Sequence, residues 1–155
     1  MLDTLKAELA AVHRFIDILQ QEQTALVSAD VDTLLTLADR KIKQSDELRL
    51  LAQQRVNQLN QAGYSGDREG MDAWLMAQAA SARKDLKKSW DDLLLAGRTA
   101  QRLNETNGKL IETHLQHNQQ ALAALANAAN QSSVYGRDGQ PQTTIPLSSR
   151  TLGKV

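Results

Sequence analysis

The feature of this sequence that most restricts its fold is a long heptad pattern in the second half of the chain. Apolar, small or amide residues recur at alternating spacings of four and three, and no proline interrupts them. This alternation is typical of a helix that packs along another helix. It predicts one helix from about residue 82 to residue 130. The predicted seam consists of Trp90, Leu94, Gly97, Gln101, Asn104, Gly108, Ile111, Leu115, Asn118, Leu122, Leu125 and Ala129.

The composition of this seam is unusual for a permanent core. Gly97 and Gly108 each cost about 1 kcal/mol relative to Ala inside a helix, which predicts the close approach of another helix. An amide on a seam lowers stability but fixes register. Such amides could hydrogen-bond within a hydrated bundle, which we favour for Gln101 and Asn104. Alternatively, they keep an empty docking surface soluble until a partner helix arrives.

Two long helices are predicted before this one. The first runs from about Asp3 to Val27 and the second from an Asp30 N-cap to about Gln61. The short turn between them predicts antiparallel neighbours. The first seam is Leu5, Leu9, Val12, Ile16, Leu19, Gln23 and Leu26. The predicted buried side of the second helix is Val31, Leu34, Ala38, Ile42, Ser45, Leu48, Ala52, Val56 and Leu59.

A loop and a short helix separate the second and last long helices. The run GYSGDREG, residues 63–70, contains three glycines and predicts a loop. Asp72 is predicted to cap a short helix, and Trp74 and Trp90 are predicted core anchors. After about Asn130 the sequence becomes rich in Ser, Thr, Gly and Pro and has no period. We therefore expect an all-α, elongated antiparallel bundle or coiled coil of three long helices and one short one, with a bundle domain over 1–131 and a flexible tail over 132–155.

Composition argues against several classes of partner. Lys and Arg (18) balance Asp and Glu (18), so the electrostatic driver of nucleic-acid binding is missing. No apolar run is long enough for a membrane span, and the N-terminus does not resemble a secretory signal. The chain has no cysteine, which fits the cytoplasm. We expect a cytoplasmic protein without nucleic-acid partners, direct membrane insertion or a cofactor.

No catalytic or metal site is predicted. His114 and His117 are three residues apart, but no acidic residue or cysteine completes a ligand set. Nothing around His114 resembles a phosphorelay site. The run GRDG at 136–139 follows no strand and opens no helix, so it is no dinucleotide loop. We expect a protein that is not an enzyme.

The predicted helix lengths do not match. The second helix would be roughly 46 Å long and the last roughly 72 Å, which leaves about 25 Å unpaired. That part, about His114 to Asn130, carries a leucine stripe widened by Ala121, Ala124 and Ala128. An apolar stripe without a partner in its own chain favours a binding surface. The alternatives are that the tail, a shifted hairpin or a second copy covers it.

Three blocks of residues resemble the FlgN-type flagellar export chaperones. They are L-N-x-x-N-G-x-L-I from Leu103 to Ile111, N-Q-Q-A-L from Asn118 to Leu122, and Y-G-x-D-G-Q from Tyr135 to Gln140. The motif residues within the helix are Asn104, Asn107, Gly108, Gln119 and Gln120. An isolated tail aromatic such as Tyr135 either packs on its own body or docks to a partner, and its sequence context leaves both open.

The resemblance implies a cytoplasmic helical chaperone of the flagellar type III export system. Such a protein binds the C-terminal helical regions of hook-associated proteins of the FlgK and FlgL type, prevents their premature assembly and delivers them to the export gate. The implied client-binding residues are Ile111, Leu115, Asn118, Leu122 and Leu125. The implied docking residues for the membrane protein of the export gate are Tyr135, Gly136, Asp138 and Gly139. We expect a monomer or weak dimer when free; the alternative is a self-associating structural coiled coil without an export client.

Overall fold

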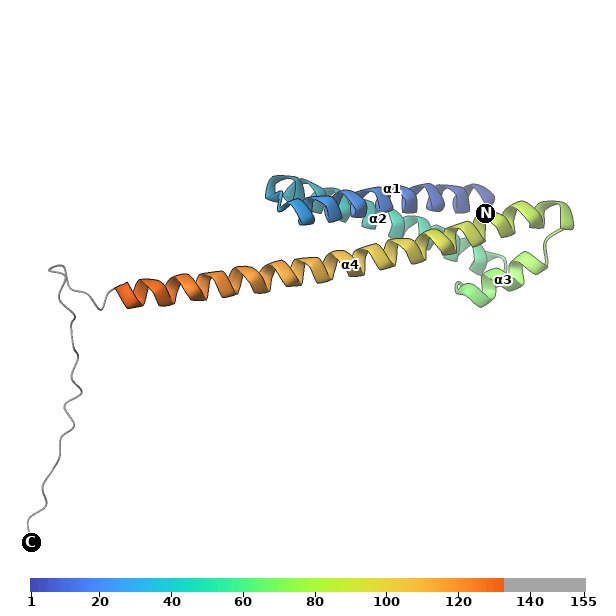
Figure 1. Ribbon diagram of the computed structural model, residues 1–155. Coiled ribbons are helices and arrows are strands. Elements are labelled where there is room, and N and C mark those ends of the chain that lie inside the picture. Colours follow the sequence, from blue (N-terminus) through green and yellow to red (C-terminus); the bar gives the residue numbers. More distant parts are fainter. Residues whose placement is uncertain (133–155) are drawn as a thin grey trace, which may run out of the picture. The chain divides into compact units, whose positions relative to one another are not determined.

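The computed structural model describes the backbone of residues 1–132 and the side chains of residues 1–129 (Figure 1). Within these residues the chain forms four helices and no strand. They are α1 (Leu2–Ser28), α2 (Val31–Gln61), α3 (Arg68–Met76) and α4 (Ala80–Ser132). The all-α class, with three long helices and one short one, is thereby confirmed. Residues 133–155 of the predicted tail lie outside the described residues, so the predicted division into 1–131 and 132–155 stays a prediction.

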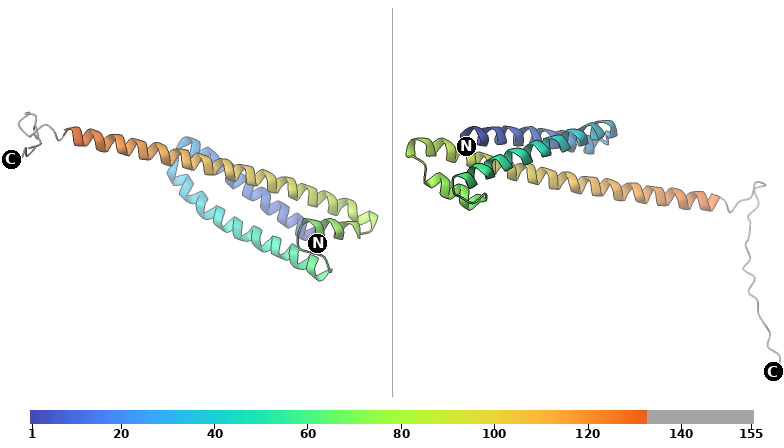
Figure 2. Two further views of the ribbon diagram at one scale, coloured as in Figure 1. Left: turned by 90° about the horizontal axis from the view of Figure 1, so that it is seen from below. Right: turned by 180° about the vertical axis from the view of Figure 1, so that it is seen from behind.

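The chain divides into two compact units, Met1–Glu112 and Thr113–Val155, and the boundary falls within α4. In the first unit, α1 and α2 form an antiparallel hairpin, and the two helices run side by side in both views of Figure 2. Three ion pairs between α1 and α2 fix their alignment. These are Arg14–Glu47 at 2.6 Å, Glu8–Arg55 at 2.9 Å and Glu22–Lys41 at 2.9 Å.

The turn of the hairpin follows from two local devices. Ala29 adopts a left-handed conformation with φ 54°, and its N–H donates to the carbonyls of Ala25 and Leu26. Asp30 caps α2 as predicted, because its carboxylate accepts from the backbone N–H of Thr33 at 3.1 Å and from the Thr33 hydroxyl at 2.7 Å. These hydrogen bonds, first the one from the Thr33 hydroxyl and then the one from its backbone N–H, lower the pKa of Asp30 below the ordinary value for an aspartate. The cap is therefore fully present above the pKa of the unfolded chain and is lost as pH falls through the lowered folded pKa.

The predicted loop at 63–70 is too long, and the predicted cap of the short helix is wrong. Asp67, not Asp72, caps α3, because its carboxylate accepts from the Gly70 N–H at 2.8 Å and from the Ser65 hydroxyl at 2.7 Å. The Ser65 bond, followed by the Gly70 bond, lowers the pKa of Asp67. Residues 68–70 are helical. A Cβ on Gly70 would lie 2.0 Å from the Ser65 carbonyl oxygen, so this glycine allows the loop to cross the helix start.

The core of the first unit joins all four helices. Trp90 is almost fully buried, and Trp74 is partly buried against the same cluster, so both predicted core anchors are confirmed. Met71 and Leu75 bring α3 against this end of the bundle. The buried cluster is Leu5, Val12, Leu19, Leu59, Met71, Leu75, Leu86, Trp90, Leu93, Ala96 and Ala100. The buried residues Leu5, Val12, Leu19 and Leu26 of α1 follow the predicted seam.

The predicted seam of α4 is one residue out of register after Trp90. The buried positions are Leu86, Trp90, Leu93, Ala96, Ala100 and Asn107. Gly97, Gln101, Asn104 and Gly108 are exposed instead. The face with Leu93, Ala96 and Ala100 and the face with Gly97, Gln101 and Asn104 both repeat at heptad spacing. The first face has more apolar area, so its burial contributes more to stability.

Two interpretations of this seam are therefore wrong. A Cβ on Gly97 or Gly108 would meet no atom within 4 Å, so no helix approaches either glycine closely. Gln101 does not bond across the bundle, because its amide donates to Glu105 of its own helix at 2.9 Å. Asn104 is likewise exposed.

The predicted buried side of α2 is also wrong in its first half. Val31, Ala38, Ile42 and Ser45 are exposed. In this half the positions that are at least partly buried are Leu34, Leu37, Lys41, Gln44 and Leu48. In the second half Leu51, Ala52, Arg55, Val56, Gln58 and Leu59 are at least partly buried, which agrees with the predicted Ala52, Val56 and Leu59. This seam contains charged residues because each has a buried acidic partner on α1, which a pattern of apolar residues alone does not reveal.

A buried polar layer connects α1, α2 and α4. The side chain of Asn107 is 0% exposed, and its amide nitrogen donates to the Leu19 carbonyl at 2.8 Å and to Glu22 at 2.7 Å. Lys41 donates to both oxygens of Glu22, at 3.0 and 2.9 Å. The two acceptors settle the orientation of the amide, because a flipped Asn107 would place its oxygen against two other oxygens.

A second layer lies nearer the N-terminus of α1. The Arg55 guanidinium donates to both carboxylate oxygens of Glu8, at 2.9 and 3.3 Å. Its Cζ atom also lies 5.2 Å from the centre of the Trp90 ring. Glu8 and Glu22 are two heptads apart on α1, as Arg55 and Lys41 are on α2. The contacts of Trp90 and Asn107 show that α4 up to Glu112 runs parallel to α1.

We predict that Asn107→Ala lowers the free energy of unfolding by about 2 kcal/mol, because it removes two buried hydrogen bonds, one of them to a carboxylate. Chemical denaturation followed by circular dichroism measures the change. Asn104→Ala is the matched control from the same motif and should change stability by less than about 0.5 kcal/mol, since Asn104 is exposed. Equal losses in the two variants would contradict a structural role specific to Asn107.

Candidate functional site

The candidate site is an exposed stripe along α4, which we call the leucine stripe: Ile111, Leu115, Asn118, Leu122 and Leu125. Its four apolar members are 47%, 55%, 66% and 67% exposed in chain order. Every residue from Ile111 to Ala129 is exposed. The predicted helix lengths left about His114 to Asn130 unpaired, and the stripe members from Leu115 onward are indeed not covered by the described part of the chain. Ile111 belongs to the first compact unit and the other members to the second.

The chemistry around the stripe is neutral. No Asp, Glu, Lys or Arg occurs between Thr113 and Ser132, where the polar residues are mainly Asn and Gln. His114 and His117 lie beside the stripe, and both are exposed. Because the backbone hydrogen bonds of a helix are internal, only side chains are available to recognise a partner here. The surface suits the apolar face of another helix rather than a small polar ligand.

The family motif residues separate onto different faces of α4. Asn107 is buried and holds the helix against α1, so its role is structural. Asn104 and Gly108 are exposed on the seam that the sequence analysis assigned to packing. Gln119 and Gln120 are exposed beside the leucine stripe. A motif that looks uniform in sequence therefore combines one internal contact with several surface positions.

Sequence reasoning missed two sets of residues. The first is the buried ion pairs Glu8–Arg55 and Glu22–Lys41, although their common spacing of two heptads was a usable signal. The second is an exposed apolar group on α2. Its large members are Val31, Leu35 and Ile42, at 63%, 66% and 63% exposed. The sequence of α2 allows two registers of burial. The register in the structure buries a face that contains Lys41 and Arg55 and is less apolar than the predicted one.

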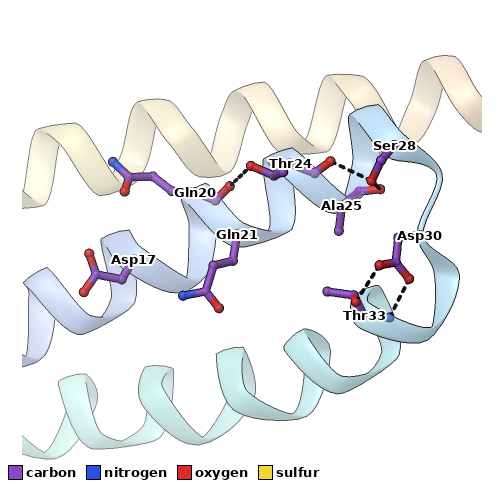
Figure 3. Close-up of a pocket in the computed structure, with 8 residues that line it drawn as sticks. All are labelled: Asp17, Gln20, Gln21, Thr24, Ala25, Ser28, Asp30 and Thr33. Carbon is purple, nitrogen blue, oxygen red and sulfur yellow. Dashed lines mark hydrogen bonds between the residues drawn. The ribbon is translucent and has the colours of Figure 1, made fainter.

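A hollow of about 490 Å³ lies beside the end of α1 (Figure 3). Its polar groups are largely engaged locally. The Thr24 hydroxyl donates to the Gln20 carbonyl at 3.1 Å, and the Ser28 hydroxyl donates to the Thr24 carbonyl at 3.0 Å. Asp30 is bonded to Thr33 as the cap of α2. These are contacts at the end of α1 and the start of α2, and they serve the helix termini.

Among residues 1–132, no three or more His, Cys, Asp or Glu side chains gather closely enough to bind a metal ion. None of the four helices combines the length and apolarity that a membrane crossing requires. Tyr135, Gly136, Asp138 and Gly139, the implied docking residues, lie outside the described residues.

Comparison with known proteins gives a family. The model of the FlgN protein family matches residues 1–143. The chain belongs to this family. A crystal structure of a flagella synthesis protein FlgN from Pseudomonas aeruginosa has a similar fold, with a TM-score of 0.64 and 24% identity over 82% of this chain and 93% of that one. No curated protein sequence matches.

We predict unequal stability effects for a buried and an exposed leucine of α4. Leu93 is 6% exposed, so Leu93→Ala should lower the free energy of unfolding by about 2–5 kcal/mol. Leu122 is 66% exposed, so Leu122→Ala should change it by less than about 0.5 kcal/mol. Denaturant titration of both variants measures the contrast. A large loss for Leu122→Ala would mean that this residue is packed in the folded chain.

Proposed function

We propose that this chain is a cytoplasmic flagellar type III export chaperone. Its clients would be hook-associated proteins of the FlgK and FlgL type, bound through their C-terminal helical regions. Membership in the FlgN family supports a role in flagellum biogenesis. The observation that favours client binding over a purely structural role is the exposed leucine stripe.

The stripe has the properties that a temporary partner needs. A client helix laid along it would bury three leucines and one isoleucine, and fully burying one such side chain contributes about 1.5–3 kcal/mol. Part of that gain is offset because an unstructured client segment must become helical on binding. The balance gives moderate affinity, which permits release at the export gate.

Binding would also prevent premature assembly. A client helix that lies on the stripe has its own apolar face covered, so that face is not available to another flagellar subunit. The chaperone needs no bound cofactor for this role, since the export machinery would supply the energy of transport. We propose no catalytic residue.

We predict that replacing Leu115, Leu122 and Leu125 together by Asp abolishes client binding. Three carboxylates on the stripe would have to be desolvated beneath the client helix, at a cost of several kcal/mol. Isothermal titration with a purified FlgK-type protein measures the affinity. The matched control is Val31, Leu35 and Ile42 together changed to Asp, which places the same charges on exposed apolar positions of α2. Its expected affinity is that of the unmodified chain.

Two results would contradict this proposal. Undiminished binding by the α4 variant would remove the leucine stripe from client recognition. A tight dimer of the free chain at micromolar concentration, abolished by the same three substitutions, would favour the self-associating coiled coil. Sedimentation velocity distinguishes that dimer from the expected monomer or weak dimer.

The proposal includes a second contact, between the tail residues Tyr135, Gly136, Asp138 and Gly139 and the membrane protein of the export gate. We predict that Tyr135→Ala weakens binding to the purified cytoplasmic domain of that protein by at least tenfold, because one aromatic anchor often dominates a small interface. Client affinity should be unchanged. A fall in melting temperature of many degrees would instead identify Tyr135 as a packing residue.

A further inference from the structure

We propose that the client-binding surface extends beyond the leucine stripe onto Gly97, Gln101, Asn104 and Gly108, and that the client helix passes closest to α4 at the two glycines. We call these four residues the glycine face. The inference rests on the proposed function, since it concerns the same client. It adds a recognition surface in the first compact unit, where the structure places these side chains outside the core.

The folded chain itself gives no reason for either glycine. Each lies inside a helix, where glycine is less favourable than alanine because it loses more backbone entropy. A Cβ at Gly97 or Gly108 would meet no atom within 4 Å. Neither residue has a positive φ. Alanine would therefore fit both positions in the free protein. The presence of glycine is explained by a partner that the free protein lacks.

A partner helix is the occupant that fits this face. Gly97, Gln101, Asn104 and Gly108 alternate at four and three residues, and the same spacing continues through Ile111 to Leu125 on α4. A helix that follows the leucine stripe in heptad register therefore meets the glycine face next. Glycine at an interface allows two helix backbones to approach closely, while the amides between the glycines can fix the register.

The size of a specific interface favours the longer surface. Stable protein complexes usually involve about 20–30 residues on each side. Only about half of the fifteen or so residues from Ile111 to Leu125 can face a single partner helix, which falls well short of that size. By the same count, adding the glycine face and its neighbours roughly doubles the surface, to about fourteen residues between Gly97 and Leu125.

The distribution of charged residues along α4 determines which way a client helix would lie on it. The helix is uncharged from Thr113 to Ser132, whereas two exposed arginines, Arg98 and Arg102, and one exposed carboxylate, Glu105, lie beside the glycine face. Within the described residues, neither arginine forms an ion pair with a carboxylate of this chain. The fitting occupant is thus an amphipathic client helix with carboxylates at the end over Gly97–Asn104 and an uncharged apolar end over Leu115–Leu125.

The test uses opposite effects on stability and binding. Gly97→Ala and Gly108→Ala, singly and together, should raise the melting temperature of the free chain by roughly 2–8 °C in total, because alanine favours the helix and nothing obstructs the methyl group. The double variant should bind a purified FlgK-type protein at least tenfold more weakly. Gly97→Leu with Gly108→Leu should bind still more weakly. Thr106→Ala is the matched control, because it raises helix propensity on another exposed face of α4 and should leave affinity unchanged.

The possible outcomes distinguish the inference about the glycine face from the proposed function. If the Asp substitutions at Leu115, Leu122 and Leu125 abolish binding but the glycine variants bind normally, this inference is overturned and the proposed function stands. If neither set affects binding, both are overturned. A lower melting temperature for Gly97→Ala or Gly108→Ala would also overturn the inference, because the glycines would then serve the folded chain.

The carboxylates proposed at one end of the client helix should make its binding depend on Arg98 and Arg102. Changing Arg98 and Arg102 to Gln should weaken binding of the same FlgK-type protein by about three- to tenfold at low salt and flatten its salt dependence. An unchanged salt dependence would overturn the assignment of carboxylates to that end of the client helix. Circular dichroism of this variant confirms that α4 remains folded.

Discussion

The buried contact among Asn107, Glu22 and Lys41 determines which face of α4 is left outside. A heptad helix can pack with either of two neighbouring faces inward, and apolar contacts alone distinguish them weakly. An amide buried between a carbonyl and a carboxylate has one acceptable position, since a small rotation of the helix would leave its N–H donors buried without acceptors. The polar layer thus fixes the rotation of α4 on α1, and the exposure of the glycine face follows from it.

The sequence predicted the helices well because their signals are local. The Asp30 cap, the glycines before α3 and the unbroken heptads of α4 each act within a few residues, and the four-helix all-α class follows from them. The leucine stripe was also predictable, because helix length can be counted. The register of α4 was not, because the choice between Leu93 and Leu94 as the inward residue depends on partners far away in the chain.

The burial of charged residues was also not predicted, because it depends on partners on another helix. Glu22 and Lys41 look like solvated residues on their own helices, and only their pairing makes burial acceptable. Such a pair does not add much stability over an apolar pair, but removing one member is costly. Charged seam positions therefore select one alignment of α1 and α2, and they leave the more apolar positions Val31, Leu35 and Ile42 on the surface.

The amides on the exposed seam resolve a conflict between solubility and binding. A continuous strip of leucines over the whole face would form an apolar patch large enough to promote aggregation. Gln101, Asn104 and Asn118 interrupt it, and Gln101 can satisfy its hydrogen bonds on its own helix while the surface is empty. Against a partner helix the same amides penalise a shifted register, since a misaligned amide would be buried without a hydrogen bond. A surface of this composition binds less tightly than one of leucine alone, but it stays soluble without its client and favours one alignment with it.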